Sequence, residues 1–381
     1  MDIVAIGSSQ GNEVDFMSLV DSSMKEKCLK YQTKCRGPYK VLRNDAKKTA
    51  VQFLEEAFKP LEQYKDKIGV VIDGSTTRGF TEPSTASLYA QHLGIDGPVC
   101  FDVTEACNGW ARAVETAYMM FQTNPNYEDK YILITNNEHP PMTRPMLPKD
   151  PSDYRQVASY YVGLTFSWAC TCTLLKKSDN YSWQFIHHSD PVYASHISIP
   201  LPQIAKGFTP KSDVYEILLN EEYGQFCIPR LHQQEKKIQF VLGTVDQNEE
   251  FYAKTNVICH TWTKYVYEEF FKNHKLGELS LYFGEIGNVG SCSMPLILHD
   301  QYKNNIPKGQ HLCFCGSAAG GSDIMLNFVH GIETEKKLQK KEKKSNLYVI
   351  YARVAWRRLL TKLGCSRRQN KVKVQADTKT Q

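Results

Sequence analysis

The sequence predicts an α/β protein in which a mostly parallel sheet is covered by helices. Apolar runs of strand length alternate with segments of helical periodicity along most of the chain. The series of strands and helices is found in the first half of the chain and again in the second. Each half ends with a potentially catalytic side chain between a strand and a helix. The chain has 381 residues, 41% of them hydrophobic, which is enough for a sizeable core.

The first half begins with a predicted strand, residues 1–7, that ends in a glycine turn. The other elements are a helix at 44–59, a strand at 68–72, a helix at 83–93, a buried strand at 99–103, a helix after 107, a strand at 131–135 and a long strand or hairpin at 161–175. Asn44 and Asp45 are expected to cap the first helix, and Gly94 to close the second. Residues 137–156 are proline-rich and predict a long loop of the kind that often lines a pocket.

The second half repeats this series after an irregular stretch. The expected elements are a strand at 183–187, an irregular region at 189–235 with one helix near 214–219, a strand at 256–260, a helix at 264–271, a strand at 279–283, a helix at 291–298 and strands at 311–315 and 323–329. We therefore expect one half at residues 1–175, a second at 176–331 and a tail at 332–381.

The tail differs from the rest of the chain in charge. The net charge of +5 divides into about +11 for residues 332–381 and about −6 for the remainder. Residues 336–344 form a charge run, and residues 347–363 combine apolar and aromatic side chains with interleaved basic ones, as in a basic amphipathic helix. Packing on the body or plain disorder is the favoured reading, ahead of contact with an anionic membrane or an acidic carrier protein.

The cysteines and the N-terminus predict a cytoplasmic protein. The twelve cysteines are dispersed, many in strand-like apolar runs, and no Cys-x-x-Cys occurs, so reduced thiols are expected. The N-terminus lacks the pattern of a signal peptide, and no apolar run reaches the length of a membrane span. His187, His188 and His196 have no second cluster to complete a metal site, so no bound metal is expected.

Cys107 is the most informative single residue, because it stands where an apolar strand passes into a helix. Unpaired N–H groups and the helix dipole at such a position favour the thiolate, the form that attacks carbonyl carbons. A buried cysteine that serves as a small apolar residue is the alternative. The position alone does not decide between the two interpretations.

Two further side chains occupy comparable positions in the second half. His260 closes an apolar strand and Asn288 precedes a helix, while residues 316–321 are all small. Each has an ordinary structural alternative: a core histidine, a turn asparagine and a hairpin loop. Because ligands of α/β sheets bind beyond the carboxyl ends of the strands, Cys107, His260 and Asn288 are expected to converge there.

Taken together, these segments resemble the thiolase superfamily, and most closely ketoacyl-ACP synthase III. Residues 102–109 match the nucleophile pattern Asp-Val-x-x-Ala-Cys-x-Gly. Residues 286–295 match Gly-Asn-x-x-x-x-Ser-x-Pro, although Ile286 replaces the usual Tyr or His. His260 matches the strand-end histidine, and Gly316, Ser317 and Ala318 match the glycine loop. The resemblance covers about residues 1–330 and implies two pseudo-symmetric βαβαβ halves in a five-layered α-β-α-β-α core.

The resemblance also implies a mechanism. Cys107 would take the acyl group from a thioester, and its backbone N–H with one from the Gly316 loop would stabilise the oxyanion. His260 and Asn288 would donate hydrogen bonds to a second, malonyl-type thioester as it loses carbon dioxide, and the enolate would attack the acyl-cysteine. Acyl-CoA or acyl carrier protein thioesters are the expected substrates. We also expect that no cofactor is permanently bound. The expected assembly is a homodimer, with a heterodimer as the alternative.

The chain departs from the family pattern at two segments. Phe166-Ser167-Trp168-Ala169 replaces a Gly-Asp-Gly-Ala motif after Phe, and His260-Thr261-Trp262-Thr263 replaces His-Gln-Ala-Asn. These differences favour a divergent member that makes a specialised, fatty-acid-derived or polyketide product. Two alternatives stay open: acyl transfer from Cys107 to an oxygen or nitrogen nucleophile, and an inactive partner subunit of a heteromeric condensing enzyme.

Overall fold

The computed structural model describes residues 1–44, 46–139, 145–189, 253–260 and 277–333, with a few further residues between 191 and 268. Residues Met1–Ile332 form one compact unit. The predictions for the tail, for most of residues 189–235 and for most of the helix at 264–271 lie outside the described residues; Tyr267 and Glu268 of that helix are described and are helical. Of the helix expected near 214–219, the described part is instead a short strand, β10 (Leu218–Leu219), paired with β9 (Ile197–Ser198).

The strands of the first half form one five-stranded sheet. Its order is β1 (Asp2–Gln10), β7 (Ala169–Lys176), β6 (Tyr131–Glu138), β4 (Ile68–Asp73) and β5 (Val99–Asp102). The pairings of β1 with β7 and of β7 with β6 are antiparallel, and those of β6 with β4 and of β4 with β5 are parallel. The expectation of a mostly parallel sheet is therefore wrong for half of the pairings.

The second half repeats this arrangement in its own five-stranded sheet. Its order is β8 (Gln184–Ser189), β14 (Ser322–Val329), β13 (His311–Ala318), β11 (Thr255–Cys259) and β12 (Glu278–Ser280). Again the first two pairings are antiparallel and the last two are parallel. The common order makes β5 the counterpart of β12, so the turns after these two strands are related by the pseudo-symmetry.

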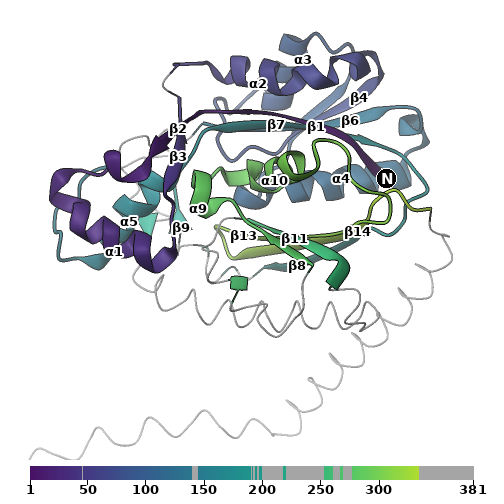
Figure 1. Ribbon diagram of the computed structural model, residues 1–381. Coiled ribbons are helices and arrows are strands. Elements are labelled where there is room, and N and C mark those ends of the chain that lie inside the picture. Colours follow the sequence, from purple (N-terminus) through teal and green to yellow (C-terminus); the bar gives the residue numbers. More distant parts are fainter. Residues whose placement is uncertain are drawn as a thin grey trace, which may run out of the picture. The chain divides into compact units, whose positions relative to one another are not determined.

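The two sheets are layered with helices, as Figure 1 shows. Helices α2 (Ala50–Phe58) and α3 (Thr85–Leu93) cover one face of the first sheet. Helices α4 (Gly109–Thr123) and α10 (Ser293–Tyr302) lie between the two sheets. These elements make up four layers of the expected five-layered core, and the fifth is a prediction for residues outside the described part.

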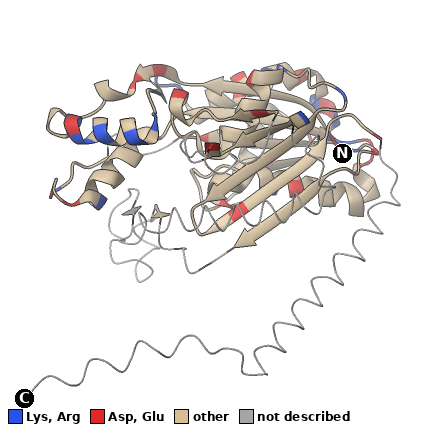
Figure 2. Cartoon of the chain, turned by 60° about the horizontal axis from the view of Figure 1, so that its bottom comes forward, with Lys and Arg blue, Asp and Glu red and all other residues tan. Residues whose placement is uncertain are grey.

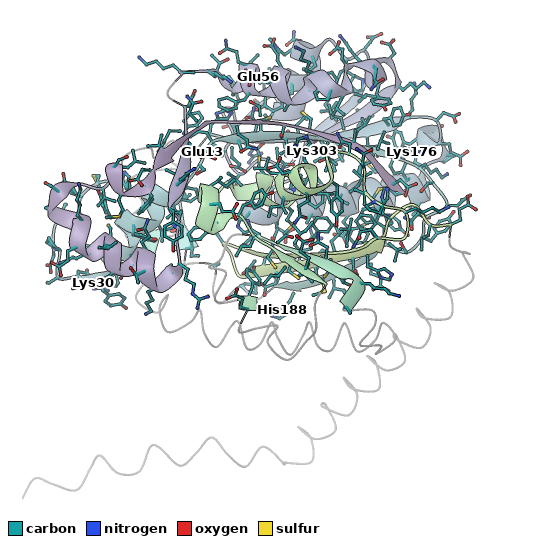
Figure 3. All side chains as sticks on the ribbon, in the orientation of Figure 1. Glu13, Lys30, Glu56, Lys176, His188 and Lys303 are labelled. Atoms are coloured by element: carbon teal, nitrogen blue, oxygen red, sulfur yellow. The ribbon has the colours of Figure 1, made fainter. Side chains whose placement is uncertain are left out.

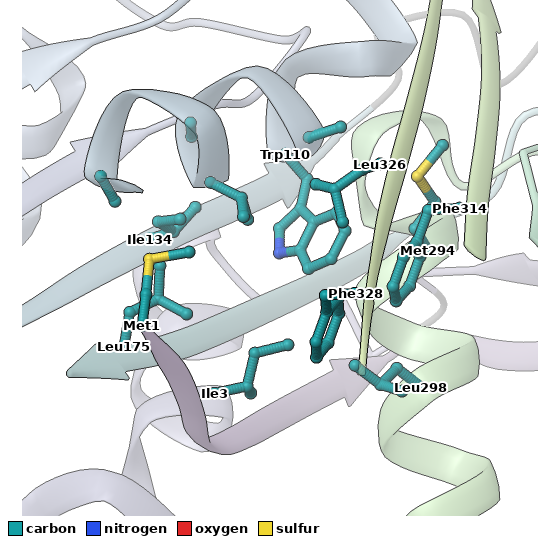
Figure 4. Close-up of a cluster of buried hydrophobic side chains, with 14 of the residues drawn as sticks. Met1, Ile3, Trp110, Ile134, Leu175, Met294, Leu298, Phe314, Leu326 and Phe328 are labelled. Atoms are coloured by element: carbon teal, nitrogen blue, oxygen red, sulfur yellow. The ribbon is translucent and has the colours of Figure 1, made fainter. Parts of the chain in front are cut away.

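The main core joins the two halves through this central layer (Figure 4). Trp110 of α4 packs its ring 5.1 Å from that of Phe314 on β13, and its indole N–H donates to Thr173 of β7. Met294 and Leu298 of α10 belong to the same cluster. The burial of these large side chains fixes the helices that carry the turns after β5 and β12.

A smaller lobe extends beside the sheets. It contains β2 (Asn12–Asp15), α1 (Lys25–Cys35), β3 (Lys40–Arg43) and α5 (Tyr154–Thr165). The labelled Lys30 lies on this lobe and Glu56 on the outer helix layer, both at the periphery of the molecule (Figure 3). None of the described helices combines the length and apolar character that crossing a membrane would require.

Two predicted strands are helical at one end in the structure. Residues 161–165, the start of the strand expected at 161–175, belong to α5, because Val157, Tyr160, Tyr161 and Leu164 recur at helical spacing and are buried on one face. Helix α9 (Phe283–Ile286) begins where the strand at 279–283 was expected to end.

Three local expectations are also corrected. The first strand continues through Gly7, where a Cβ would overlap the Ala57 carbonyl, so the glycine allows α2 to approach β1. Helix α2 is capped by Thr49 in a capping box with Gln52, whereas Asn44 bonds to Lys48 in the preceding turn. Strand β5 is an edge strand rather than a buried one, and Val99 is 47% exposed.

Candidate active site

The nucleophile candidate lies in a tight turn between β5 and α4. Cys107 occupies a 3-10 turn, η4 (Ala106–Asn108), directly before α4, and its side chain is half-buried. Ala106 has φ +44°, a left-handed conformation that an alanine rarely adopts. The surrounding contacts therefore hold the turn in a conformation that its own sequence does not favour.

An ionic cluster missed by the sequence analysis holds this turn. Arg112 of α4 bonds to Glu105 at 2.5 Å and to Glu115 at 2.5 Å. The Ser322 hydroxyl of β14 donates to Glu105 as well, and His187 of β8 lies 2.8 Å from Glu115. Since Glu105 directly precedes Ala106, the cluster ties the nucleophile turn to two strands of the second sheet.

The Gly316 segment contacts the same turn. Gly316, Ser317 and Ala318 belong to β13, which extends to Ala318, so the expected loop is shorter than residues 316–321. A Cβ at Gly316 would overlap the side-chain oxygen of Asn108, which explains why a glycine stands there. The Asn108 amide also donates to the Ser322 carbonyl at 3.2 Å.

Asn288 is held in a defined orientation by its backbone and its side chain. Its backbone N–H donates to Thr165 at 2.7 Å, and its carbonyl accepts from Ser167 at 2.8 Å. Its side-chain oxygen accepts from the Gly290 N–H at 2.8 Å. The amide orientation is thereby fixed, and with respect to the part of the chain that the structure describes the Nδ2 group is left to donate.

Residues 166–169, where the chain departs from the family pattern, help to hold the segment that carries Asn288. The Ser167 hydroxyl accepts from the Leu42 N–H at 2.9 Å and donates to the Ile286 carbonyl at 2.5 Å. The Trp168 ring packs near Phe53 and His139, in the cluster beneath α2. The tryptophan that replaces a small residue of the family motif thus lies on the outer face of the first sheet, away from the layer of α4 and α10.

His260 follows β11 and is 2% exposed. Its backbone N–H donates to the Cys315 carbonyl at 2.9 Å, and its Nδ1 lies 3.0 Å from the Ser293 hydroxyl. Burial lowers the pKa of the imidazole to about 3, so the ring is neutral at physiological pH.

The tautomer of this imidazole depends on Ser293. The Ser293 hydroxyl also reaches the Gly290 carbonyl, at 2.9 Å, and it has only one proton. When that proton goes to Gly290, Nδ1 of His260 carries the hydrogen and Nε2 can accept a proton. When the hydroxyl turns to Nδ1, Nε2 becomes a donor.

The candidate residues thus belong to connected elements. The η4 turn packs against β13 and against η7 (Gly290–Cys292), the turn that follows Asn288. Ser293, the first residue of α10, connects that turn to His260. These contacts connect the segments that carry Cys107, Asn288 and His260, the three residues expected to converge, with the β13 segment that carries Gly316.

Glu138 is a further residue of this region that the sequence analysis missed. It ends β6, is 5% exposed and accepts hydrogen bonds from Ser291 and Thr76. A signal was present, because the acid follows an apolar strand directly after Asn136 and Asn137. The predicted strand stopped at residue 135 and left Glu138 in a loop.

The expectation of a stabilised thiolate at Cys107 is not supported. Burial, with the nearby Glu138 carboxylate as a lesser cause, raises the pKa of the Cys107 thiol to about 12. These effects outweigh the N-terminal position of the turn. The resting nucleophile is therefore a neutral thiol, which needs a proton acceptor when substrate binds.

This protonation state predicts the pH dependence of alkylation. Labelling of Cys107 by iodoacetamide should be slow at pH 7 and should rise about tenfold per pH unit up to pH 9, since the thiolate fraction is far from saturation. Peptide mapping by mass spectrometry measures the rate at this residue. A rate that levels off below pH 8 would contradict the raised pKa.

Comparison with known proteins agrees with the fold. No family model matches the chain. Beta-ketoacyl-[acyl-carrier-protein] synthase III of Latilactobacillus sakei is 24% identical over 276 residues, which span 69% of this chain and 78% of that protein. The acyl-CoA:acyl-CoA alkyltransferase of Xanthomonas campestris is 35% identical over 74 residues, 19% of this chain and 21% of that protein.

Solved structures give a more extensive match at lower identity. OleA of Xanthomonas campestris superposes with a TM-score of 0.68 and 16% identity, covering 86% of this chain and 98% of that one. The 3-oxoacyl-(acyl carrier protein) synthase III, FabH, of Xanthomonas oryzae gives 0.65 with the same identity and coverage. The fold is therefore the thiolase fold of these solved proteins. In sequence the chain is similar to ketoacyl-ACP synthase III at low identity.

Proposed function

We propose that this protein is a ketoacyl synthase III-like condensing enzyme, an acyltransferase that joins two thioesters. The Cys107 sulfur attacks the carbonyl carbon of an acyl thioester, and the departing thiolate takes up the thiol proton through His260. A malonyl-type thioester then loses carbon dioxide, and the resulting enolate attacks the acyl-cysteine. A carbon–carbon bond forms, the Cys107 thiolate leaves and is reprotonated, and a β-ketoacyl thioester is released.

The backbone supplies the donors for the tetrahedral intermediate of the acylation. The Cys315 carbonyl faces the β11 edge of β13, because it accepts from the His260 N–H at 2.9 Å. Residues two apart on a strand present their backbone groups to the same edge, so Ser317 directs its N–H beyond the end of β11. We assign the oxyanion to this N–H and to that of Cys107, with Gly316 and Ala318 shaping the approach.

The fixed amide of Asn288 is the observation that carries the proposal. The Gly290 N–H occupies the side-chain oxygen, so the Nδ2 hydrogens are available to the enolate oxygen. His260 becomes a second donor when the Ser293 hydroxyl turns to Nδ1. An amide donates a hydrogen bond without giving up its proton, which suits an enolate that has to attack carbon.

Acyl-CoA and acyl carrier protein are the proposed donors of the acyl group, with no permanently bound cofactor. Basic residues along α1 support an anionic carrier (Figure 2): Lys25, Lys27, Lys30 and Lys34. Gly37, just after α1, packs against Gly284 of α9, the helix that leads to Asn288. The departures of the chain from the family pattern support a specialised fatty-acid-derived or polyketide product. The dispersed cysteines support a cytoplasmic location.

A second candidate is condensation of two acyl-CoA molecules without decarboxylation. The similarity to the Xanthomonas campestris proteins favours it, since the name of one specifies two acyl-CoA substrates. Acyl transfer to oxygen or nitrogen is less favoured, because it forms no enolate for Asn288 to stabilise. An inactive partner subunit is also less favoured, because it would not need a half-buried thiol connected to the Asn288 turn.

Product analysis distinguishes these candidates. With an acyl-CoA and ¹³C-labelled malonyl-CoA, decarboxylative condensation yields labelled carbon dioxide and a β-ketoacyl thioester that carries the label. Condensation of two acyl-CoA molecules yields a β-ketoacyl thioester when malonyl-CoA is omitted. Formation of an ester or amide as the sole product, or consumption of no thioester at all, would overturn the proposal.

We also propose a homodimer, formed through the open edge of β5. Among the described strands β5 lies at the edge of its sheet, and Val99 on it is 47% exposed, so an apolar side chain lies on that edge. Light scattering should give twice the mass of the chain. Val99→Lys should shift the protein toward the monomer, whereas Met119→Lys on α4 should not; a wild-type monomer at micromolar concentration would refute the dimer.

A further inference from the structure

The carboxylate of Glu138, at the end of β6, accepts four hydrogen bonds from the protein. Its Oε1 accepts from the Thr76 N–H at 2.8 Å, from the Ser291 N–H at 3.2 Å and from the Ser291 hydroxyl at 2.5 Å. Its Oε2 accepts from the Thr77 hydroxyl at 3.0 Å. The donors come from two segments: the loop after β4 and the turn between Asn288 and α10.

These contacts indicate a structural role for the buried carboxylate. Three donors bond to Oε1 and one bonds to Oε2, so both oxygens are engaged by the protein. Because an ionised acceptor strengthens each of these hydrogen bonds, the carboxylate acts as an anchor between the two segments.

The anchored turn is the one that orients Asn288. Gly290, whose N–H holds the Asn288 side-chain oxygen, lies against Glu138: a Cβ at this glycine would be 2.8 Å from the carboxyl carbon. Gly290 has φ +54°, which glycine adopts without strain. The Gly290 carbonyl and Ser293 then continue the chain of contacts to His260.

We propose that Glu138 is a positioning residue, whose carboxylate fixes the turn of residues 288–291 and thereby aims Asn288 at the enolate. The inference rests on the proposed function for its chemical consequence. Acylation of Cys107 does not use Asn288, so loss of the anchor should separate the two half-reactions. The anchor places a negative charge near the nucleophile, which opposes thiolate formation there.

The test compares Glu138→Ala and Glu138→Gln with Glu62→Ala, a control at an exposed carboxylate. Glu138→Ala should reduce carbon dioxide release from malonyl-CoA by about thirtyfold or more, mainly in kcat, and leave acylation of Cys107 within about threefold of the wild type. Glu138→Gln keeps an accepting oxygen, so it should restore most of the decarboxylation. It should also accelerate alkylation of Cys107 at pH 8, because the charge is gone.

A second measurement does not depend on activity. Hydrogen–deuterium exchange of the peptide that spans residues 287–292 should rise at least tenfold in Glu138→Ala and stay near wild type in Glu138→Gln. Equal losses of acylation and decarboxylation, or unchanged exchange in Glu138→Ala, would overturn the anchor. If Glu138→Ala does not fold, a Glu138→Gln protein that loses decarboxylation while exchange of residues 287–292 stays at the wild-type level would overturn it, because the turn would then be held without the expected effect on Asn288. A wild-type protein that releases no carbon dioxide but shows the exchange effect would refute the proposed function alone.

Discussion

Replacing Asn288 with alanine is expected to reduce carbon dioxide release from malonyl thioesters by on the order of a hundredfold or more. The fixed amide of Asn288 donates to the oxygen on which the enolate charge develops, and alanine removes this donor. Acylation of Cys107 should continue at close to the wild-type rate, because that step uses backbone donors. Release of labelled carbon dioxide measures the first effect, and mass spectrometry of the intact protein measures the second.

The control variant for this result is Asn126→Ala. Asn126 is an exposed turn asparagine between α4 and β6, beyond the end of α4 opposite to Cys107. It should behave as the wild type in both measurements. Decarboxylation that survives in Asn288→Ala would contradict the role of the amide, and it would favour plain acyl transfer.

Replacing Cys107 with serine is expected to abolish the covalent acyl adduct and to reduce condensation by at least about a thousandfold. A serine hydroxyl is a far weaker nucleophile than a thiol, and the neutral His260 is a weak base for it, since its pKa is about 3. Incubation with an acyl thioester, followed by intact mass measurement, detects the adduct. Decarboxylation of malonyl thioesters should persist in part, because His260 and Asn288 are unchanged.

Cys35→Ser is the matched control for this variant. Cys35 is partly accessible and lies at the end of α1. Its replacement should leave adduct formation unchanged. An adduct that persists in Cys107→Ser but disappears in Cys35→Ser would move the nucleophile to a different part of the chain.

The strand and helix pattern was predictable where the apolar period is regular. Strands β4 and β6 and helix α3 lie at or near their predicted positions. The end of helix α5, residues 161–165, was predicted as the start of a strand because its aromatic and β-branched residues also favour strands, and local sequence does not show which face is buried. The edge position of β5 was not predictable either, since an apolar edge strand and a buried strand have the same composition.

The candidate site likewise has a part that could be predicted from the sequence and a part that could not. Cys107, His260 and Asn288 could be proposed from the sequence because each stands at a strand end or before a helix in a recognisable motif. The contacts of Glu138 and of the Glu105–Arg112 cluster could not be predicted, because their partners are remote. Glu138 and Ser291 are 153 residues apart, and Glu105 and Ser322 are 217 apart. The protonation state of Cys107 was predicted wrongly, because burial against Glu138 is a tertiary effect that outweighs the helix terminus.

The most direct test of the central claim is the covalent intermediate itself. The wild-type protein, incubated with a panel of acyl-CoA and acyl carrier protein thioesters, should gain the mass of one acyl group per chain, and peptide mapping should locate it on Cys107. The gain should disappear when malonyl-CoA is added, as the acyl group leaves in the β-keto product. An acyl group on a different residue, or no gain with any thioester, would contradict the account.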